Sequence, residues 1–289
     1  MLLQQLANGV MLGSTYALVA IGYALVFGVL RVLHLAHGEV FMVGAFVGVE
    51  AVIWLNVGPF AALIGGLIGA AMLGMLIELI AFRPIRRREG SFLAPIVSSI
   101  GAGLVLQEVM TKLFGAEQIA FPDQFTSRVY DLGFISVSGA QIFILAVAFA
   151  SMGILHLFIT RTRYGMAMRA TAENLQVASI LGINVDTVIL LTFAVASGLA
   201  GVLVGLNYNA ISPFMGIDMT TKGLAVMLIG GLGSIYGAMT AGLLLGIVEV
   251  ISVAYLASSY RDAFAFCLMI LVLLLRPRGL FGSGVDVER

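Results

Sequence analysis

Long apolar segments of similar length constrain this chain more than any other feature of its sequence. An α-helix needs roughly 20 apolar residues to cross the hydrocarbon core of a bilayer. Segments of about that length recur along the 289 residues, of which 61% are hydrophobic and 10% charged. The sequence therefore predicts an all-α, polytopic membrane protein with about eight or nine spans, at residues 6–30, 38–57, 60–82, 92–114, 139–160, 187–209, 219–234, 236–257 and 262–275.

The number of spans depends on the glycine-rich segment "GGLGSIYG", from Gly230 to Gly237. Clustered glycines mark breaks in helices, and a broken helix at membrane depth can belong to a re-entrant segment. Residues 219–257 are therefore interpreted either as two crossings or as one re-entrant segment.

Composition limits the chemistry to expect. The formal net charge is +0 and Cys267 is the only cysteine, so neither nucleic-acid binding, a disulfide nor a cysteine-ligated metal is indicated. The sequence has no G-x-x-x-x-G-K-[ST] motif for binding a nucleotide. We expect a single transmembrane domain over residues 1–289, which is not an enzyme and has no cofactor or metal of its own.

Basic residues divide the connections between spans into two sets. Cytoplasmic loops of membrane proteins carry an excess of Lys and Arg, so the arginine clusters are predicted to face the cytoplasm, with the N-terminus outside and the C-terminus inside. The predicted external residues are Lys112, Arg128, Lys222 and Arg261. The predicted cytoplasmic residues are Arg31, Arg83, Arg86, Arg87, Arg88, Arg161, Arg163, Arg169, Arg276, Arg278 and Arg289.

One polar stretch, "RATAENLQVASILGIN" from Arg169 to Asn184, interrupts the apolar segments. It predicts a short cytoplasmic helix over about 169–183, with Thr171 as N-cap, Glu173 in the first turn and Gly182 as the C′ stop. An apolar stripe at three- to four-residue spacing comprises Leu175, Ala178, and Leu181 or Gly182.

The charge of this stretch indicates what its helix contacts. Helices that lie along lipid headgroups usually carry Lys or Arg on their polar face, and there is none between Thr171 and Asp186. Docking into a groove of a cytoplasmic partner is therefore favoured. Asn184 or Asp186 can then cap the transmembrane helix that follows.

Charged residues within apolar segments are costly in a membrane and are candidates for function. Glu249 lies deepest in its span, where it is either a buried carboxylate that accepts hydrogen bonds from a neighbouring helix or part of the pathway or gate. Glu108 has Lys112 four residues later, and the two are predicted to pair near the outer surface.

The segment "HLAHGEVFM" groups His34, His37 and Glu39 around Gly38 at the first turnaround. Three interpretations remain open: a metal site formed by two histidines three residues apart, a polar break that caps the second span with Glu39 at its N-terminus, or a gate on the substrate path.

Asn207 and Tyr208 lie where another span is predicted to meet water. They are either an interfacial anchor or a contact with substrate or with an external delivery protein.

Four segments together resemble one known family. They are "ATAENLQVASILGIN", "HLAHGEVFMVGAF", "GLAVMLIGGLGSIYGAMTAGLLLGIVE" and "LLRPRGLFG", in the order and spacing of the branched-chain amino acid permeases of ABC importers. The resemblance covers essentially the whole chain. It implies the ABC importer permease fold and import of branched-chain amino acids.

The resemblance also implies partners. Such a permease works in a bacterial inner membrane with a similar second permease, two ATPase subunits that bind ATP and Mg²⁺, and a periplasmic or lipid-tethered substrate-binding protein. The polar stretch would then be the coupling helix that docks in an ATPase cleft, through Arg169, Ala172, Glu173, Leu175, Ala178, Leu181 and Gly182.

Two alternatives to this function stay open. Permeases for urea or short-chain amides are very similar to this family. A secondary transporter driven by an ion gradient is a different class, in which Glu249, Glu108 or the segment from His34 to Glu39 would carry coupling protons.

Overall fold

The computed structural model of the chain describes residues 2–88, 93–120, 129–131, 136–198, 210–256 and 258–282. Within these ranges the regular structure is helical apart from four strands of two or three residues each. The predicted all-α class is therefore confirmed.

Seven helical segments among the described residues are long and apolar enough to cross a membrane, and their limits agree closely with predicted spans. Two of them combine shorter elements: α3 (Pro59–Ile77) continues through η1 (Glu78–Phe82) into α4 (Arg83–Arg87), and η3 (Ser258–Tyr260) leads into α13 (Arg261–Leu275). The other five are α1 (Leu2–Leu30), α2 (His37–Leu55), α5 (Ala94–Phe114), α6 (Gly139–Arg161) and α12 (Ile235–Tyr255).

Seven of the predicted eight or nine spans are found among the described residues, because one predicted segment forms a shorter helix and another is described only in part. The segment predicted at 219–234 forms α11 (Met215–Gly230), whose 16 residues extend about 24 Å and fall short of a bilayer core of about 30 Å. The segment predicted at 187–209 forms α9 (Val185–Gly198), and residues 199–209 lie outside the description. Hydropathy measures how apolar a segment is, whereas its helical length depends on where turns occur.

The region from 219 to 257 forms two separate helices. A tight turn joins α11 to α12, and Gly231 and Gly233 adopt positive φ values of 106° and 75° there. Such angles favour glycine, which has no Cβ to collide with the backbone.

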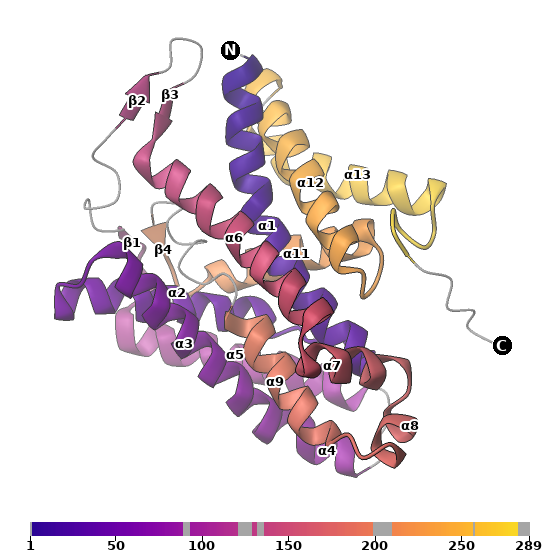
Figure 1. Cartoon of the computed structure of the whole chain (residues 1–289). Coiled ribbons are helices and arrows are strands. Elements are labelled where there is room, and N and C mark those ends of the chain that lie inside the picture. The colour runs from indigo at the N-terminus through magenta and orange to yellow at the C-terminus, as the bar shows by residue number, and fades with distance from the viewer. Residues whose placement is uncertain are drawn as a thin grey trace.

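The centre of the molecule is the antiparallel pair of α1 and α12 (Figure 1). A Cβ atom on Gly242 would lie 2.5 Å from the Cα of Ala17, and one on Gly13 would lie 2.7 Å from the Cα of Leu243. Small residues allow helix backbones to approach this closely, which drives helix association in lipid through van der Waals contact. Gly242 on α12 and Gly13 on α1 therefore serve packing within the chain.

Short strands join distant segments at one end of the molecule. The hairpin of β2 (Val129–Asp131) and β3 (Ser136–Ser138) lies beside the start of α1 in Figure 1, where the Gln4 side chain bonds with backbone atoms of Ser136. Nearby, β1 (Ile119–Ala120) pairs antiparallel with β4 (Ala210–Ile211). These strands fix the connection after α5 to the segment that leads into α11.

The other end of the molecule carries α4, α7 (Arg163–Glu173) and α8 (Leu175–Ile180), below the bundle in Figure 1. We call it the arginine-rich end, after Arg83, Arg86, Arg87, Arg161, Arg163 and Arg169.

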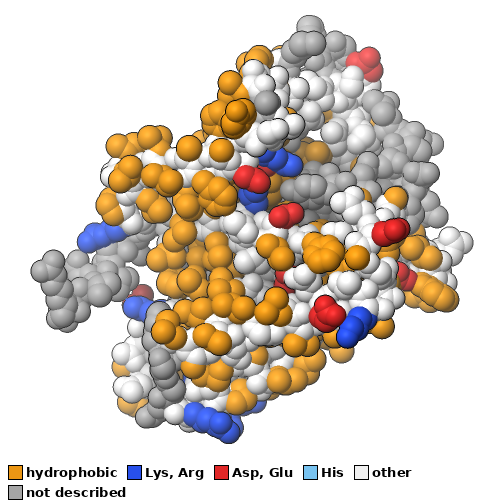
Figure 2. Space-filling model, turned by 180° about the vertical axis from the view of Figure 1, so that it is seen from behind, with side chains coloured by type: hydrophobic (Ala, Val, Ile, Leu, Met, Phe, Trp, Pro, Cys, Tyr) orange, Lys and Arg blue, Asp and Glu red, His pale blue; other side chains and the backbone are white. Residues whose placement is uncertain are grey.

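Apolar side chains are abundant on the outside of the helices. Figure 2 shows them spread over much of one face, with few charged groups among them. Only 17% of the residues in the apolar stretch of α5 are buried within this chain, and only 11% of those in the segment from Ser258 to Leu275. These helices lie at the periphery, with faces available to lipid or to another subunit.

Candidate functional site

The predicted coupling segment is built from two helices. Thr162 begins α7 by accepting a hydrogen bond from the backbone N–H of Gly165 at 3.0 Å. The chain becomes extended at Asn174, whose side-chain oxygen accepts from the N–H groups of Gln176 and Val177 at 2.9 and 3.0 Å and so begins α8. Each helix therefore has its own N-cap.

The prediction of a single helix over 169–183 was consequently wrong. Thr171 is not an N-cap: it is buried inside α7, and its hydroxyl donates to the carbonyl oxygen of Ala167 at 2.7 Å. Glu173 is the last residue of α7 rather than part of a first turn. Thr171 and Asn174 are both suitable caps by residue type, and tertiary packing of α7 determined which one was used.

The end of the segment follows the prediction. Gly182 adopts a φ of +85°, its N–H donates to Ser179, and the N–H of Ile183 donates to Ala178, each at 3.0 Å. These bonds form a Schellman motif, which confirms Gly182 as the C′ residue. Asn184 accepts from the N–H of Thr187 at 3.1 Å and caps α9, as expected.

Short α8 exposes a set of apolar side chains that we call the α8 patch. The exposed fractions are 36% for Leu175, 51% for Val177, 84% for Ile180 and 73% for Leu181. Ala178 is 1% exposed and faces the protein, so the predicted stripe divides between the two sides of α8. An apolar set that this chain leaves uncovered is typical of a site that binds a protein or a membrane.

The remaining predicted coupling residues join the segment to the bundle. The guanidinium of Arg169 donates to the carbonyl oxygen of Ile159 near the end of α6. Ala172 is partly buried and packs against the hydrophobic core. The helix that precedes the α8 patch is therefore bonded to the end of α6 and packed against the core.

A cluster of charged groups holds the start of α9 at the arginine-rich end. Asp186 accepts hydrogen bonds from Arg83, Arg86 and Arg87, each with an N–O distance of 2.8 Å, and Arg86 also pairs with buried Glu78 at 2.8 Å. The bonds from Arg83, then from Arg87 and Arg86, hold the pKa of Asp186 well below its usual range. The carboxylate of Asp186 therefore stays ionised and ties α9 to α4.

The sequence predicted Asp186 only as a helix cap and did not predict its bonds to the three arginines. Its partners lie about 100 positions earlier in the chain. The available signal was the complementary charge of "RPIRRREG" at the same predicted membrane face.

Glu249 is fully buried on α12 and joins helices that are far apart in sequence. It accepts hydrogen bonds from the hydroxyl of Tyr16 on α1 at 3.1 Å, from Lys222 on α11 at 3.3 Å and from Arg261 on α13. Lys222 also pairs with Asp262 at 2.6 Å. The Glu249 cluster, as we call these five residues, agrees with the interpretation of a buried, hydrogen-bonded carboxylate.

Of the residues expected on the external side, Lys222 is buried within the protein, whereas Arg261 is partly exposed. Lys222 is 8% exposed, because α11 places it between α12 and α13. Sequence reasoning found Glu249 from its depth in the span but had no local signal for these partners.

The two histidines of the first turnaround lie in an aromatic environment. The rings of His34 and His37 are 5.4 Å apart, and Phe82 and Phe193 lie 5.0 and 5.2 Å from His34. The ring nitrogens of both histidines are buried and have no hydrogen-bond partner. No group of three or more His, Cys, Asp or Glu residues that could hold a metal occurs in the described ranges.

A break separates α1, which ends at Leu30, from α2, which begins at His37, and Gly38 lies in the first turn of α2. A Cβ there would lie 2.7 Å from the backbone nitrogen of Thr220, so glycine allows α2 to approach the start of α11. Glu39 is in the same first turn, as expected, and its carboxylate lies against Gly216 with 5% of the residue exposed. Two helix N-termini thus meet beside one buried acid.

The other predicted pathway residues, Asn207 and Tyr208, lie outside the described residues. Near the place where that segment ends, a cavity of about 480 Å³ lies between the β1–β4 connection and the start of α11. Its lining combines apolar and polar side chains, including Gln118, Phe214, Met215, Asp218 and Met219.

Comparisons with known proteins agree with this architecture. Residues 5–273 match the family model described as branched-chain amino acid transport system / permease component. LivH of Salmonella typhimurium, a high-affinity branched-chain amino acid transport system permease protein, is 41% identical, with 99% of this chain and 97% of the relative covered. BraD of Pseudomonas aeruginosa, which has the same description, is 39% identical with the same coverage.

A solved structure has a similar fold. It is PsaBC from Streptococcus pneumoniae in complex with Fab, with a TM-score of 0.53 and 14% sequence identity. The match covers 94% of this chain and 91% of that chain. That likeness concerns the fold alone. The family match and the two relatives show that the chain belongs to the branched-chain amino acid transport system permease family.

Proposed function

We propose that this chain is the transmembrane permease subunit of an ATP-driven ABC importer that moves branched-chain amino acids into the cytoplasm. The observation that carries the proposal is the exposed α8 patch on an otherwise membrane-embedded chain of this family. Relatives described as branched-chain amino acid permeases favour this substrate class over urea and short-chain amides.

The proposal assigns energy supply and substrate capture to other chains. Two ATPase subunits bind ATP and Mg²⁺, a second permease of the LivM type completes the pathway, and a periplasmic binding protein delivers the substrate. The location is a bacterial inner membrane, with the N-terminus outside and the arginine-rich end in the cytoplasm.

Within this assembly, α7 and α8 form the coupling segment. The α8 patch supplies an apolar surface to a groove of an ATPase subunit. Movement of the ATPase reaches the bundle through Arg169, which bonds the end of α6, and through Asp186, which ties α9 to α4.

A matched pair of substitutions tests the coupling role. Ile180→Glu places a charge in the α8 patch, and we expect at least a tenfold loss of ATP-driven leucine uptake with weaker co-purification of the ATPase. The control is Tyr130→Glu, which changes a 49% exposed side chain in β2 at the other end of the molecule. Wild-type uptake and ATPase binding by the Ile180→Glu variant would reject this role for α8.

Reconstitution tests the transport class. In proteoliposomes, the complete complex should accumulate leucine only with ATP, whereas the chain alone should show no saturable uptake under a proton or sodium gradient. Uptake by the chain alone would establish a secondary transporter instead. Transport of urea or acetamide in preference to leucine would redirect the proposal to the amide and urea importers.

A further inference from the structure

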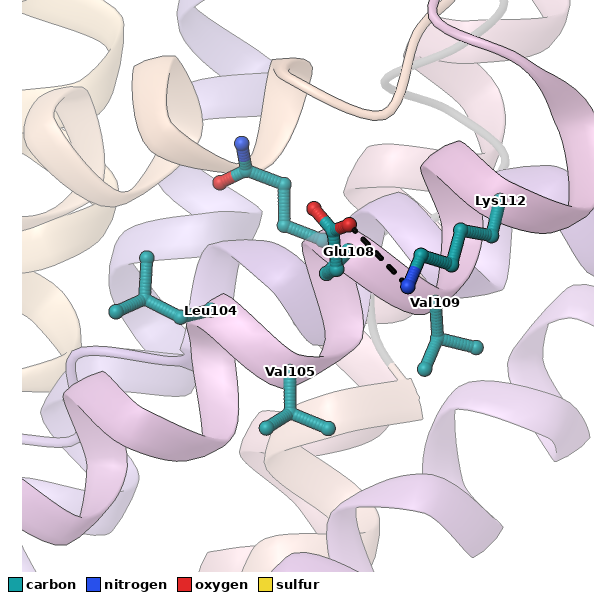
Figure 3. Close-up of a pocket in the computed structure, with 6 residues that line it drawn as sticks. Leu104, Val105, Glu108, Val109 and Lys112 are labelled. Carbon is teal, nitrogen blue, oxygen red and sulfur yellow. Dashed lines mark ion pairs between the residues drawn. The ribbon is translucent and has the colours of Figure 1, made fainter.

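An open, shallow site lies on the outer face of α5, and we call it the α5 groove. It has a volume of about 460 Å³, and all of its lining comes from this one helix. Figure 3 shows Glu108 directed toward Lys112 across the groove, with Leu104, Val105 and Val109 beside them. Gln107 completes the lining.

The charged pair in this α5 groove is exposed although it belongs to a membrane-spanning helix. The side chains of Glu108 and Lys112 are 67% and 75% exposed, and their N–O distance is 3.7 Å. Glu108 lies roughly 9 Å before the end of α5 at Phe114, given a rise of 1.5 Å per residue. The predicted pairing of these two residues is confirmed.

Ionised side chains in membrane helices almost always face the interior of a bundle or a water-filled cavity. This pair points away from the rest of the chain, because α5 is a peripheral helix and only 17% of the residues in its apolar stretch are buried. Acyl chains would solvate neither charge. This face of α5 therefore meets water, either at the outer membrane surface or in a path that a second permease subunit would complete.

The groove offers three kinds of group that match one class of solute. The carboxylate of Glu108 is suited to an ammonium group, and the ammonium of Lys112 to a carboxylate. Leu104, Val105 and Val109 are 61%, 62% and 45% exposed and supply an apolar surface beside the charges. An α-amino acid with an aliphatic side chain carries all three complementary groups on one carbon atom.

The ion pair can exchange its partners for such a solute. At 3.7 Å between exposed groups it is a weak interaction, since solvent screens it and both side chains are long. A zwitterion that enters the groove replaces each charge by another of the same sign, so neither Glu108 nor Lys112 loses its counter-charge. Weak, replaceable contacts of this kind suit a site that must also release its solute.

We propose that the α5 groove binds the zwitterion of an aliphatic amino acid during its passage, with Glu108 holding the ammonium group and Lys112 the carboxylate. The proposal rests on the proposed function and names the substrate contact within it. It also separates substrate classes, because urea and amides carry no charges that this pair would match.

A charge exchange provides the sharpest test. The double variant Glu108→Lys with Lys112→Glu keeps an oppositely charged pair four residues apart on α5 but reverses its direction. If the pair only stabilises the helix, leucine uptake by the intact complex is unchanged. If it holds the zwitterion, we expect at least a tenfold lower rate of ATP-driven uptake at saturating binding protein.

A direct measurement accompanies uptake. Photoreactive leucine should label peptides from α5 in the wild-type complex, and the exchanged variant should lose this labelling. The control is Glu117→Gln, an exposed acid outside the groove, which should keep uptake and labelling. Co-purification of all subunits verifies that each variant folds and assembles.

The outcomes separate the inference from the proposed function. Wild-type uptake and α5 labelling by the exchanged variant would overturn the zwitterion site while leaving the importer intact. Absence of ATP-driven leucine uptake by the wild-type complex would instead reject the proposed function. Loss of uptake with retained labelling would also contradict the inference, because leucine would then occupy the groove without the proposed charge contacts.

Discussion

At the scale of single residues, the buried ion pair of Glu249 and Lys222 contributes to the stability of the helix bundle. A buried charge is tolerated only where partners replace its water, and Glu249 has three of them on α1, α11 and α13. Lys222 divides its charge between Glu249 and Asp262. Removal of either member takes away a buried counter-charge, although Lys222 then keeps Asp262, and Glu249 keeps Tyr16 and Arg261.

Glu249→Gln should lower the free energy of unfolding by about 1–3 kcal/mol, because Lys222 and Arg261 lose a buried counter-charge while Lys222 keeps Asp262. SDS titration in mixed micelles, followed by circular dichroism, measures the change. Glu117→Gln, at an exposed position, should stay within about 0.5 kcal/mol of the wild type.

The pairing itself is tested by combining Glu249→Gln with Lys222→Met. The double variant should lose less free energy of unfolding than the sum of the two single losses, by at least about 1 kcal/mol. The reason is that each single variant already removes the interaction between Glu249 and Lys222. Additive losses would contradict a direct interaction between the two side chains.

The residues that could be predicted from the sequence are those governed by near neighbours. Gly182 and Asn184 act within one helical turn of their positions, so residue type sufficed to place them. The partners of Glu249 lie as far as 233 positions away, and no local pattern encodes them. Thr171 was misassigned because Asn174 competes for the same role and packing decides between them.

At the scale of elements, apolar segments predicted the long helices but not the short ones. The limits of α2, α5 and α6 follow the edges of their apolar segments within about two residues. The turn at 231–234 falls in the glycine-rich segment that predicted a break, whereas the break at Asn174 has no signal in the hydropathy. The predicted coupling segment was thus found in the right place with the wrong internal structure.

The pairing of α1 with α12 leads to a prediction on this scale. Gly242→Ala should destabilise the fold by about 1–3 kcal/mol, because the added Cβ would lie 2.5 Å from backbone atoms of Ala17 and neither helix can shift freely. Unfolding of the detergent-solubilised protein in SDS gives the measurement.

The matched control is Gly101→Ala on α5, where no atom lies within 4 Å of the added Cβ. This change should be neutral or stabilise the helix by about 0.5–1 kcal/mol, as alanine has the higher helix propensity. Equal effects of the two substitutions would show that the approach of α1 and α12 does not limit stability.

At the scale of the whole molecule, the surfaces that this chain leaves exposed indicate where other molecules could bind. The peripheral helices present apolar faces, α5 adds its charged pair, and the α8 patch lies at the arginine-rich end. Under the two proposals above, these surfaces would contact lipid, a water-filled path beside a second subunit, and an ATPase. The family match supports a transport permease, and the proposals assign its partners to these surfaces.

Orientation in the membrane can be measured with single cysteines in a Cys267→Ser background. Because arginines are concentrated at one end, a cysteine at Ser179 on α8 should react with an impermeant maleimide only after cells are permeabilised. A cysteine at Glu117, just after the end of α5 at Phe114, should react in intact cells. The reverse pattern would invert the predicted topology.

Asp186 has a mechanical consequence. The carboxylate lies four positions after Gly182, and three arginines of α4 bond to it. Because α4 continues α3 through η1, Asp186 joins α9 and α3 at one point. If an ATPase moves α8 as proposed above, the displacement would pass to α9 and α3 together, and these three bonds would determine how it is shared.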